Sequence, residues 1–193
     1  AAFETAAHVA RIDLYNNRIT TAPMETRGAI GDYSAVDDAY ILPSSIQAPH
    51  NPRSTLAQNI FHEPESKFRV IARDVGGGFG LKGQLHPEEA LVLWASKRIC
   101  RPVKWISDRS ESFLGDNQAR DQHAEGELAL DAHGKFLGLR VRGMHNCGAY
   151  IVGSACVPIT FSLRVAPSVY AIPAIDLMSR MVFPHTPPTA PYR

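Results

Sequence analysis

The spacing of apolar and polar residues predicts β-strands near the start of the chain and through much of its second half. Asp37-Asp38 separates two early strands and is expected to form the turn of a hairpin. Ala132-His133-Gly134 separates two longer alternating stretches and predicts a second hairpin, with its glycine in the left-handed conformation. The predicted strands are residues 9–15, 28–33, 39–42, 68–72, 103–106, 122–131, 136–145 and 176–182.

Two other stretches carry apolar residues at helical spacing. Residues 53–61 form the first predicted helix, with Asn51 as its N-terminal cap and Pro52 at its first position. Residues 87–100 form the second predicted helix, which ends before Pro102 because proline does not continue a helix.

The remaining segments lack a clear period. Residues 107–120 are polar and are expected to be irregular, with residues 108–111 as an exposed loop that holds local ion pairs. Residues 146–165 are small and apolar and are poorly defined as structure. The whole pattern predicts an α+β fold, a mixed β-sheet with about two main helices packed on one face.

A glycine-rich stretch, Asp74-Val75-Gly76-Gly77-Gly78-Phe79-Gly80-Leu81-Lys82-Gly83, lies between a predicted strand and the longer helix. Five of its last eight residues are glycine, which costs much chain entropy on folding. Such a turn lets the backbone approach a ligand closely and direct several N–H groups at it. The helix start behind it adds positive dipole, so an anionic or oxygen-rich ligand is the expected guest.

Known glycine motifs match this turn poorly. The phosphate loop G-x-x-x-x-G-K-[ST] fails on both sides of Lys82, at Leu81 and at Gly83. The nucleotide fingerprint G-x-G-x-x-G fits residues 78–83, but the acidic residue expected ~20 positions later is Asp108, about 30 positions on. Spacing alone therefore leaves a structural turn, an anion-binding turn and a nucleotide-binding turn open.

Composition excludes several classes of function. Twenty Lys and Arg residues against 19 Asp and Glu residues give a net charge of +1, which does not favour nucleic acid. No apolar run reaches ~18 residues, so no membrane span is predicted. The three cysteines form no C-x-x-C pair and the eight histidines are scattered, which predicts a reducing compartment and no protein-ligated metal or iron–sulfur site. The missing Met and the end at Arg193 suggest a piece of a longer protein.

Seven short motifs occur in an order that resembles the large, molybdopterin-binding subunit of the xanthine dehydrogenase / aldehyde oxidase / carbon monoxide dehydrogenase family. The resemblance spans nearly the whole chain, and it rests on the order of the motifs rather than on any one of them. The motifs are PMETR (23–27), SSIQAPH (44–50), DVGGGFGLKG (74–83), PVKW (102–105), DR (108–109), NCGAY (146–150) and APYR (190–193).

The resemblance implies that residues 1–193 are the first part of the molybdenum cofactor-binding region of a larger subunit, with the N- and C-terminal remainder missing. The implied cofactor is a molybdenum–pyranopterin, which in bacteria often has the cytosine dinucleotide form. The implied reaction is hydroxylation at carbon with oxygen taken from water. Iron–sulfur clusters and FAD are expected on partner subunits of a cytoplasmic oligomer.

The resemblance also assigns residues to the site. Gln47 resembles the glutamine whose amide donates a hydrogen bond to a ligand of the metal, and a neutral donor suits that role because a carboxylate would repel the ligand's charge. Gln47 is therefore the catalytic candidate. The cofactor-binding candidates are Gln47, Gly77, Gly78, Phe79, Gly80 and Arg193.

Departures from the family pattern narrow the expected substrate. Purine-oxidising members carry a glutamate at the position of Gly83, so a purine is not expected. The family's general base lies beyond this chain, so the isolated piece is expected to be inert and to expose apolar surface. The intact protein is expected to oxidise an aldehyde or N-heteroaromatic compound. The alternatives are a carbon monoxide-oxidising member, a nucleotide-binding dehydrogenase domain or a binding module.

Overall fold

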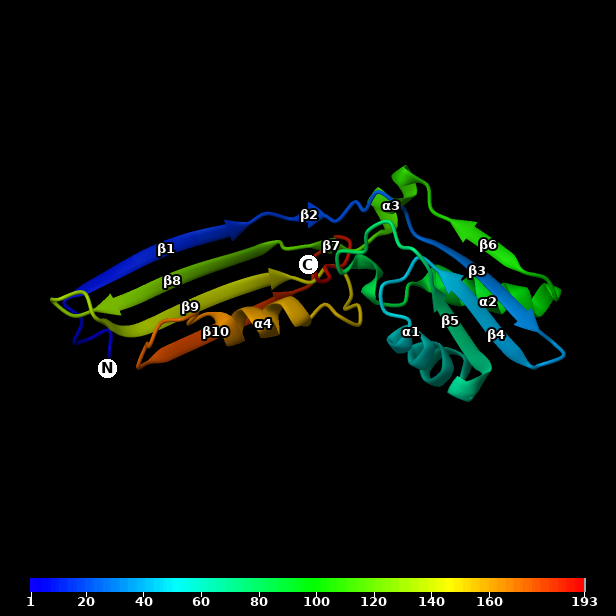
Figure 1. Cartoon of the computed structure of the whole chain (residues 1–193). Coiled ribbons are helices and arrows are strands. Elements are labelled where there is room, and N and C mark those ends of the chain that lie inside the picture. The colour runs from blue at the N-terminus through cyan, green and yellow to red at the C-terminus, as the bar shows by residue number, and fades with distance from the viewer. Residues whose placement is uncertain (193) are drawn as a thin grey trace. The chain divides into compact units, whose positions relative to one another are not determined.

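The computed structural model describes residues 1–192, which fold as two units (Figure 1). Unit 1 comprises residues 1–19 and 117–191, and unit 2 comprises residues 20–116 with Tyr192. Each unit contains a four-stranded sheet with both parallel and antiparallel neighbours. The predicted α+β class is confirmed, but the strands divide into two mixed sheets where the sequence pattern suggested one.

The sheet of unit 2 has the strand order β5-β4-β3-β6. β3 pairs antiparallel with both β4 and β6, and β4 pairs parallel with β5. The predicted hairpin around Asp37-Asp38 is confirmed as the β3–β4 connection. The four strands are β3 (Gly28–Ser34), β4 (Ala39–Ser44), β5 (Phe68–Ala72) and β6 (Val103–Ile106).

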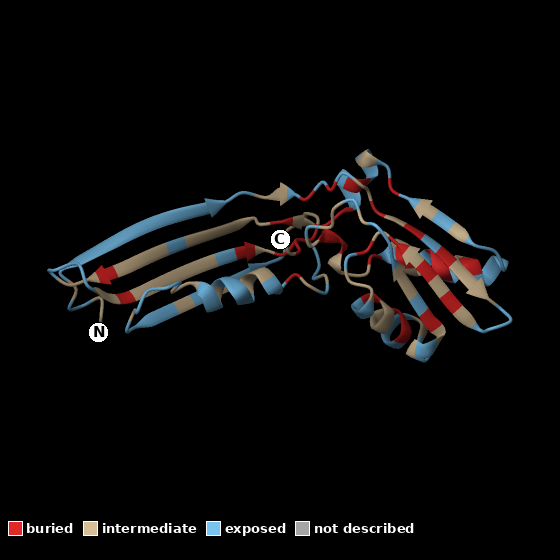
Figure 2. Cartoon of the chain, in the orientation of Figure 1, coloured by how far each residue is buried: buried red, intermediate tan, exposed pale blue. Residues whose placement is uncertain are grey.

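Two helical segments of unit 2 share one core with this sheet. One is α1 (His50–Thr55), which continues as a π-helical segment over Leu56–Phe61, and the other is α2 (Pro87–Ile99). Short 3-10 turns cover Glu65–Lys67 and Leu81–Gly83. Figure 2 shows the buried positions along β4, β3 and the helices. The core side chains are Ala29, Tyr40, Leu42, Leu56, Ala57, Phe68, Val92 and Leu93.

Two predictions about helices were wrong, one on the cap of α1 and one on the irregular structure of residues 107–120. α1 begins at His50 after Pro49, so Asn51 is not its cap, and no side chain caps this helix. Pro52 is still tolerated because the first-turn N–H groups have no partner within a helix. The segment expected to be an irregular loop contains α3 (Arg109–Gly115), where the Asp108 carboxylate accepts a hydrogen bond from Glu111 N at 2.7 Å. That cap satisfies an N–H group that the helix leaves unpaired.

The sheet of unit 1 has the strand order β1-β8-β9-β10. β9 pairs parallel with β10, and the other neighbours are antiparallel, which confirms the predicted hairpin of β8 and β9. The strands are β1 (His8–Asn16), β8 (Gln122–Leu130), β9 (Phe136–Asn146) and β10 (Ile175–Val182).

A helix and two minor strands complete the described residues. The stretch that sequence left undefined contains α4 (Val157–Val165), which contacts β10 (Figure 1). The two-residue strands β2 (Ile19–Thr20) and β7 (Gln118–Ala119) pair with each other. Within residues 1–192 no helix is long and apolar enough to cross a membrane.

Candidate functional site

The glycine turn joins β5 to α2 in unit 2, as the sequence predicted. Gly77 and Gly80 have φ angles of 97° and 94°, a region that glycine enters at little cost. Phe79 between them has φ of 52° and an exposed side chain. A bulky residue with positive φ is strained, and such strain concentrates at functional sites. The turn therefore presents an exposed aromatic ring from a strained backbone position.

Gln47 lies beside this turn, three residues after the end of β4. Its backbone N–H donates to the carbonyl of Lys82 at 2.9 Å, and its Oε1 accepts a hydrogen bond from the N–H of Gly80 at 2.9 Å. Because a backbone N–H only donates, the amide oxygen must face Gly80. The Gln47 NH₂ group consequently points away from that contact, and among residues 1–192 it has no hydrogen-bond partner.

Two backbone donors of the turn are also free. In the described part of the chain the N–H groups of Gly78 and Phe79 donate no hydrogen bond, whereas the N–H of Gly80 is used to orient Gln47. Gly78 is pressed against Gln47, since a Cβ on Gly78 would lie 2.3 Å from Gln47 Oε1. The predicted residues Gln47, Gly78, Phe79 and Gly80 are thus brought together, while Arg193 lies outside the described residues.

Two residues that sequence analysis gave no role complete the surroundings of the turn. The Glu25 carboxylate accepts hydrogen bonds from the N–H of Gly76 at 2.8 Å and from Lys82 Nζ at 2.7 Å. Burial raises the pKa of Glu25, but these two hydrogen bonds outweigh it and hold that pKa below its ordinary value. The signal that could have found the pair is a lysine between two glycines, Gly80 and Gly83, together with a glutamate in the PMETR motif.

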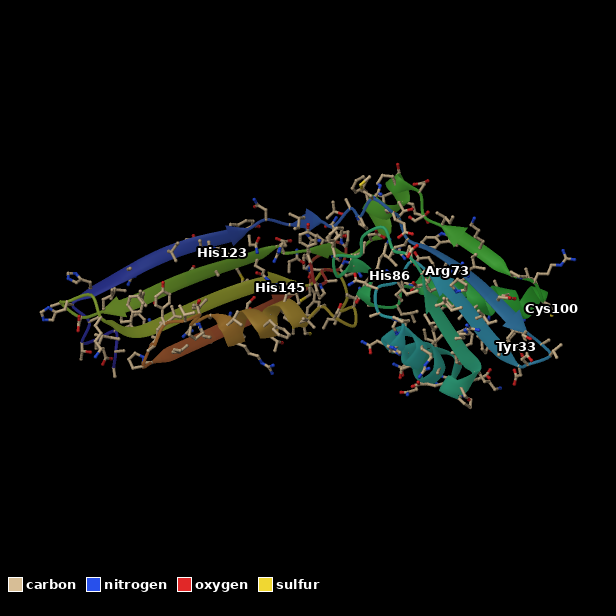
Figure 3. All side chains as sticks on the ribbon, in the orientation of Figure 1. Tyr33, Arg73, His86, Cys100, His123 and His145 are labelled. Atoms are coloured by element: carbon tan, nitrogen blue, oxygen red, sulfur yellow. The ribbon has the colours of Figure 1, made fainter. Side chains whose placement is uncertain are left out.

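The start of α2 is fixed by a buried polar pair, His86 and Glu89, of which His86 is labelled in Figure 3. His86 Nε2 lies 3.0 Å from the carbonyl of Leu81 and donates to it, while Glu89 accepts from the His86 N–H at 2.7 Å and from the Ser44 hydroxyl at 2.8 Å. Burial raises the pKa of Glu89. Burial, reinforced by the nearby Arg27 guanidinium, lowers the pKa of His86.

This lowered pKa predicts acid-sensitive stability. The unfolded chain binds the His86 proton more tightly, so the stabilisation is fully present above pH ~6.5 and is lost as pH falls toward the folded-state pKa. We expect the His86→Gln variant to lose less thermal stability than wild type between about pH 7.5 and about pH 5.5. Thermal unfolding at the two pH values measures this. The exposed His133→Gln control should keep the wild-type pH dependence, and equal slopes for both variants would contradict the assignment.

Other candidate chemistry is absent from the described residues. Residues 1–192 hold no cluster of three His, Cys, Asp or Glu side chains that could bind a metal ion. Cys147 is buried, and burial raises the pKa of its thiol, so it is a poor nucleophile. His123 and His145 lie on β8 and β9 of unit 1, where they contact Asp13 and Gln122 respectively (Figure 3).

The geometry does not match a nucleotide fingerprint. That motif requires its glycines to open the helix, so that the helix N-terminus faces the pyrophosphate. Here Gly83 ends a 3-10 turn and α2 begins only at Pro87. β5 is also an edge strand with a single parallel neighbour, whereas the fingerprint belongs to an extended parallel sheet.

Comparison with known proteins identifies the family. Residues 1–193 match the molybdopterin cofactor-binding domain. The chain belongs to this family. The resemblance drawn from the seven motifs is thereby confirmed at the level of the family, and the molybdopterin cofactor-binding domain is built here from both units.

Individual relatives agree with this assignment. The nicotine 6-hydroxylase large subunit of Paenarthrobacter nicotinovorans is 37% identical over 178 residues, covering 91% of this chain and 22% of the relative. The carbon monoxide dehydrogenase large chain of Hydrogenophaga pseudoflava is 37% identical over 150 residues, covering 78% and 19%. Quinoline 2-oxidoreductase from Pseudomonas putida 86 superposes with a TM-score of 0.93 at 38% identity, covering 100% of this chain and 25% of that chain. The chain thus spans about a quarter or less of these relatives.

The donors of this molybdopterin cofactor-binding domain fit a molybdenum–pyranopterin. Such a group presents oxygen acceptors, and the site offers an amide NH₂ and two backbone N–H groups without partners among residues 1–192. The oxygen atoms of such a group accept hydrogen bonds and these three N–H groups can donate them, so the donor set and the cofactor are complementary.

Proposed function

We propose that this chain is the first part of the cofactor-binding region in the large subunit of a molybdenum-dependent oxidoreductase, which hydroxylates an N-heteroaromatic compound or an aldehyde with oxygen from water. The observation that carries the proposal is the Gln47 amide, whose oxygen is held by the Gly80 N–H at 2.9 Å so that its NH₂ remains available as a donor.

The roles of the chain's own residues follow from that arrangement. Gln47 donates a hydrogen bond from Nε2 without carrying charge, and its fixed orientation spares reorganisation during the reaction. The free backbone N–H groups of Gly78 and Phe79 would help to hold the cofactor from the turn. The exposed, strained Phe79 lies 6.3 Å from the Tyr192 ring, centroid to centroid, next to these donors. A bound molybdenum–pyranopterin supplies the two-electron redox chemistry of hydroxylation.

The proposed substrate class rests on Gly83 and on the relatives. A Cβ at Gly83 would lie 3.8 Å from Gln47 Nε2, so a side chain there would stand beside the amide. Glycine leaves that space open and provides no polar group for a purine ring. The relatives named nicotine 6-hydroxylase and quinoline 2-oxidoreductase support an N-heteroaromatic substrate, and the nicotine 6-hydroxylase match covers 91% of this chain against 78% for the carbon monoxide dehydrogenase large chain at equal identity.

The remaining proposals concern the intact protein. Electrons leave through partner subunits that carry iron–sulfur clusters and FAD, and the pterin has the cytosine dinucleotide form. The names "large subunit" and "large chain" of the relatives support a multi-subunit enzyme. The three free thiols support a reducing, cytoplasmic location. The isolated chain is inert because the general base and half of the cofactor pocket lie outside it.

Replacing Gln47 by glutamate tests its donor role. Glutamate keeps the size of the side chain and the oxygen that accepts from Gly80, but it removes the NH₂ donor and adds a negative charge. We expect kcat/KM of the full-length enzyme to fall about 10²- to 10³-fold, as measured by steady-state kinetics normalised to bound molybdenum.

Asn51→Asp is the matched control, because it makes the same amide-to-carboxylate change at an exposed position of α1. It should retain wild-type kinetics. A Gln47→Glu enzyme with wild-type kcat/KM per molybdenum would remove Gln47 from the proposed mechanism.

Isotope labelling tests the reaction itself. The full-length enzyme with its partner subunits is incubated in ¹⁸O-labelled water with a panel of N-heteroaromatic compounds, aldehydes and carbon monoxide. We expect ¹⁸O in a hydroxylated heteroaromatic product or in a carboxylic acid. Oxygen incorporated from O₂, or turnover of carbon monoxide alone, would contradict the proposal.

A further inference from the structure

We propose that Glu25 is a positioning residue that clamps the two ends of the glycine turn and so holds Gln47 in place. The inference rests on the proposed function, since it assigns Glu25 to the same cofactor site. Glu25 and Lys82 are not themselves among the free donors of the site, so their role is to hold the residues that are.

The clamp is formed by one carboxylate oxygen. Glu25 Oε2 accepts from the Gly76 N–H at 2.8 Å and from Lys82 Nζ at 2.7 Å, and these residues lie at the start and near the end of the turn. The backbone of Glu25 adds a third bond, from its N–H to the carbonyl of Gly76 at 3.1 Å. A Cβ on Gly76 would lie 2.6 Å from Glu25 Cβ, so glycine is required for this approach.

The ion pair between the Glu25 carboxylate and the buried Lys82 ammonium stabilises the clamp. The Lys82 side chain is 1% exposed, and Glu25 is its carboxylate partner among residues 1–192. A buried ammonium without a partner is costly, so Lys82 keeps the Glu25 carboxylate at this position. The hydrogen bonds that hold the pKa of Glu25 below its ordinary value keep the carboxylate charged at neutral pH. The pair is therefore a constant link and not a pH switch.

Gln47 is connected directly to both sides of this link. The Lys82 carbonyl accepts from the Gln47 backbone N–H at 2.9 Å, and Gly80, between the clamped ends, binds the Gln47 amide oxygen. A shift of Lys82 would move the backbone of Gln47, and a shift of Gly80 would release its side chain. Glu25 thus acts on Gln47 through the turn.

The segment that carries Glu25 is itself anchored. The Arg109 guanidinium, at the start of α3, donates to the carbonyl of Pro23 at 2.6 Å and to that of Met24 at 2.9 Å. Pro23 packs against the turn, since a Cβ on Gly77 would lie 3.3 Å from Pro23 Cβ. Two of the motifs that suggested the family, PMETR and DR, therefore act together and hold the glycine turn from outside.

The test compares Glu25→Ala with Glu65→Ala in the full-length enzyme with its partner subunits. Glu65 forms a partly exposed ion pair with Arg53 and serves as the matched control. Amide hydrogen exchange of residues 74–83 and kcat per bound molybdenum are measured for both variants. We expect Glu25→Ala to exchange at least tenfold faster in this segment, with unchanged exchange in α2, and to lose at least tenfold in kcat with KM little changed. Glu65→Ala should match wild type.

Lys82→Met is the second variant and keeps the proposal testable if Glu25→Ala does not fold. It removes the buried charge and keeps a side chain of similar volume. We expect faster exchange of residues 80–83 and a lower kcat per molybdenum. Wild-type exchange and wild-type kcat per molybdenum in a folded variant, whatever its melting temperature, would overturn the clamp. A wild-type enzyme without molybdenum would instead contradict the proposed function, while the exchange data would still decide the clamp.

Discussion

Replacing Gly78 by alanine is expected to reduce kcat/KM per bound molybdenum of the full-length enzyme about 10³-fold while the protein stays folded. The added Cβ would lie 2.3 Å from Gln47 Oε1, 2.7 Å from Cδ and 2.9 Å from Cγ. These atoms belong to the outer part of a flexible, exposed side chain, so Gln47 rotates away at small cost in stability. Its amide then loses the Gly80 hydrogen bond that orients it, and the donor is misplaced.

Gly83→Ala is the matched control within the same turn. Its Cβ would lie 3.8 Å from the Gln47 amide, an ordinary contact that requires no movement. We expect this variant to keep its molybdenum and to change kcat/KM by less than about tenfold. Steady-state kinetics of both variants measure the loss of activity, and their melting temperatures show whether each variant stays folded. Wild-type activity of Gly78→Ala would show that the observed Gln47 orientation is not the working one.

Replacing Gly31 by alanine is expected to destabilise the protein by about 3 kcal/mol. Gly31 lies in β3 under α2, and a Cβ there would approach Val92 C at 2.3 Å, Val92 O at 2.4 Å and Leu93 N at 2.5 Å. All three atoms are backbone, so the whole helix must move off the sheet. Val92 and Leu93 belong to the core of unit 2, which loses packing in the process.

Gly115→Ala is the control for this change, because no heavy atom lies within 4 Å of its added Cβ. Its effect on the free energy of unfolding should stay within about 0.5 kcal/mol. Thermal or denaturant unfolding of the two variants measures the difference. Equal stability of Gly31→Ala and Gly115→Ala would contradict the close packing of α2 on β3.

Much of the fold was predictable from local signals. The strand Phe68–Ala72, the strand Val103–Ile106 and the hairpin of β8 and β9 were located because alternation and turn residues are encoded within a few positions. α3 was missed although Asp108 and Glu111 have the spacing of a capping sequence, because its short, polar run lacks an apolar period. The division into two units was not visible, since residues 1–19 pair with strands more than a hundred positions later.

The candidate site was predictable in composition and not in geometry. Motif resemblance placed Gln47 and the glycine turn in one site, and the structure brings them together. The motifs could not predict the hydrogen bond from Gly80 that orients the Gln47 amide, because the two residues are 33 positions apart. The Glu25–Lys82 pair, 57 positions apart, was overlooked for the same reason. Contacts between distant residues depend on tertiary packing, and the spacing of apolar and polar residues in a single sequence does not show which distant residues meet.

Molybdenum content of the full-length subunit, purified with its partner subunits, tests the central claim most directly. Elemental analysis should find about one molybdenum per large subunit in wild type, and clearly less in the Gly78→Ala variant, in which Gln47 is displaced. An intact, folded wild-type complex without molybdenum, expressed in a host able to make the cofactor, would contradict the account and leave the glycine turn as a structural element.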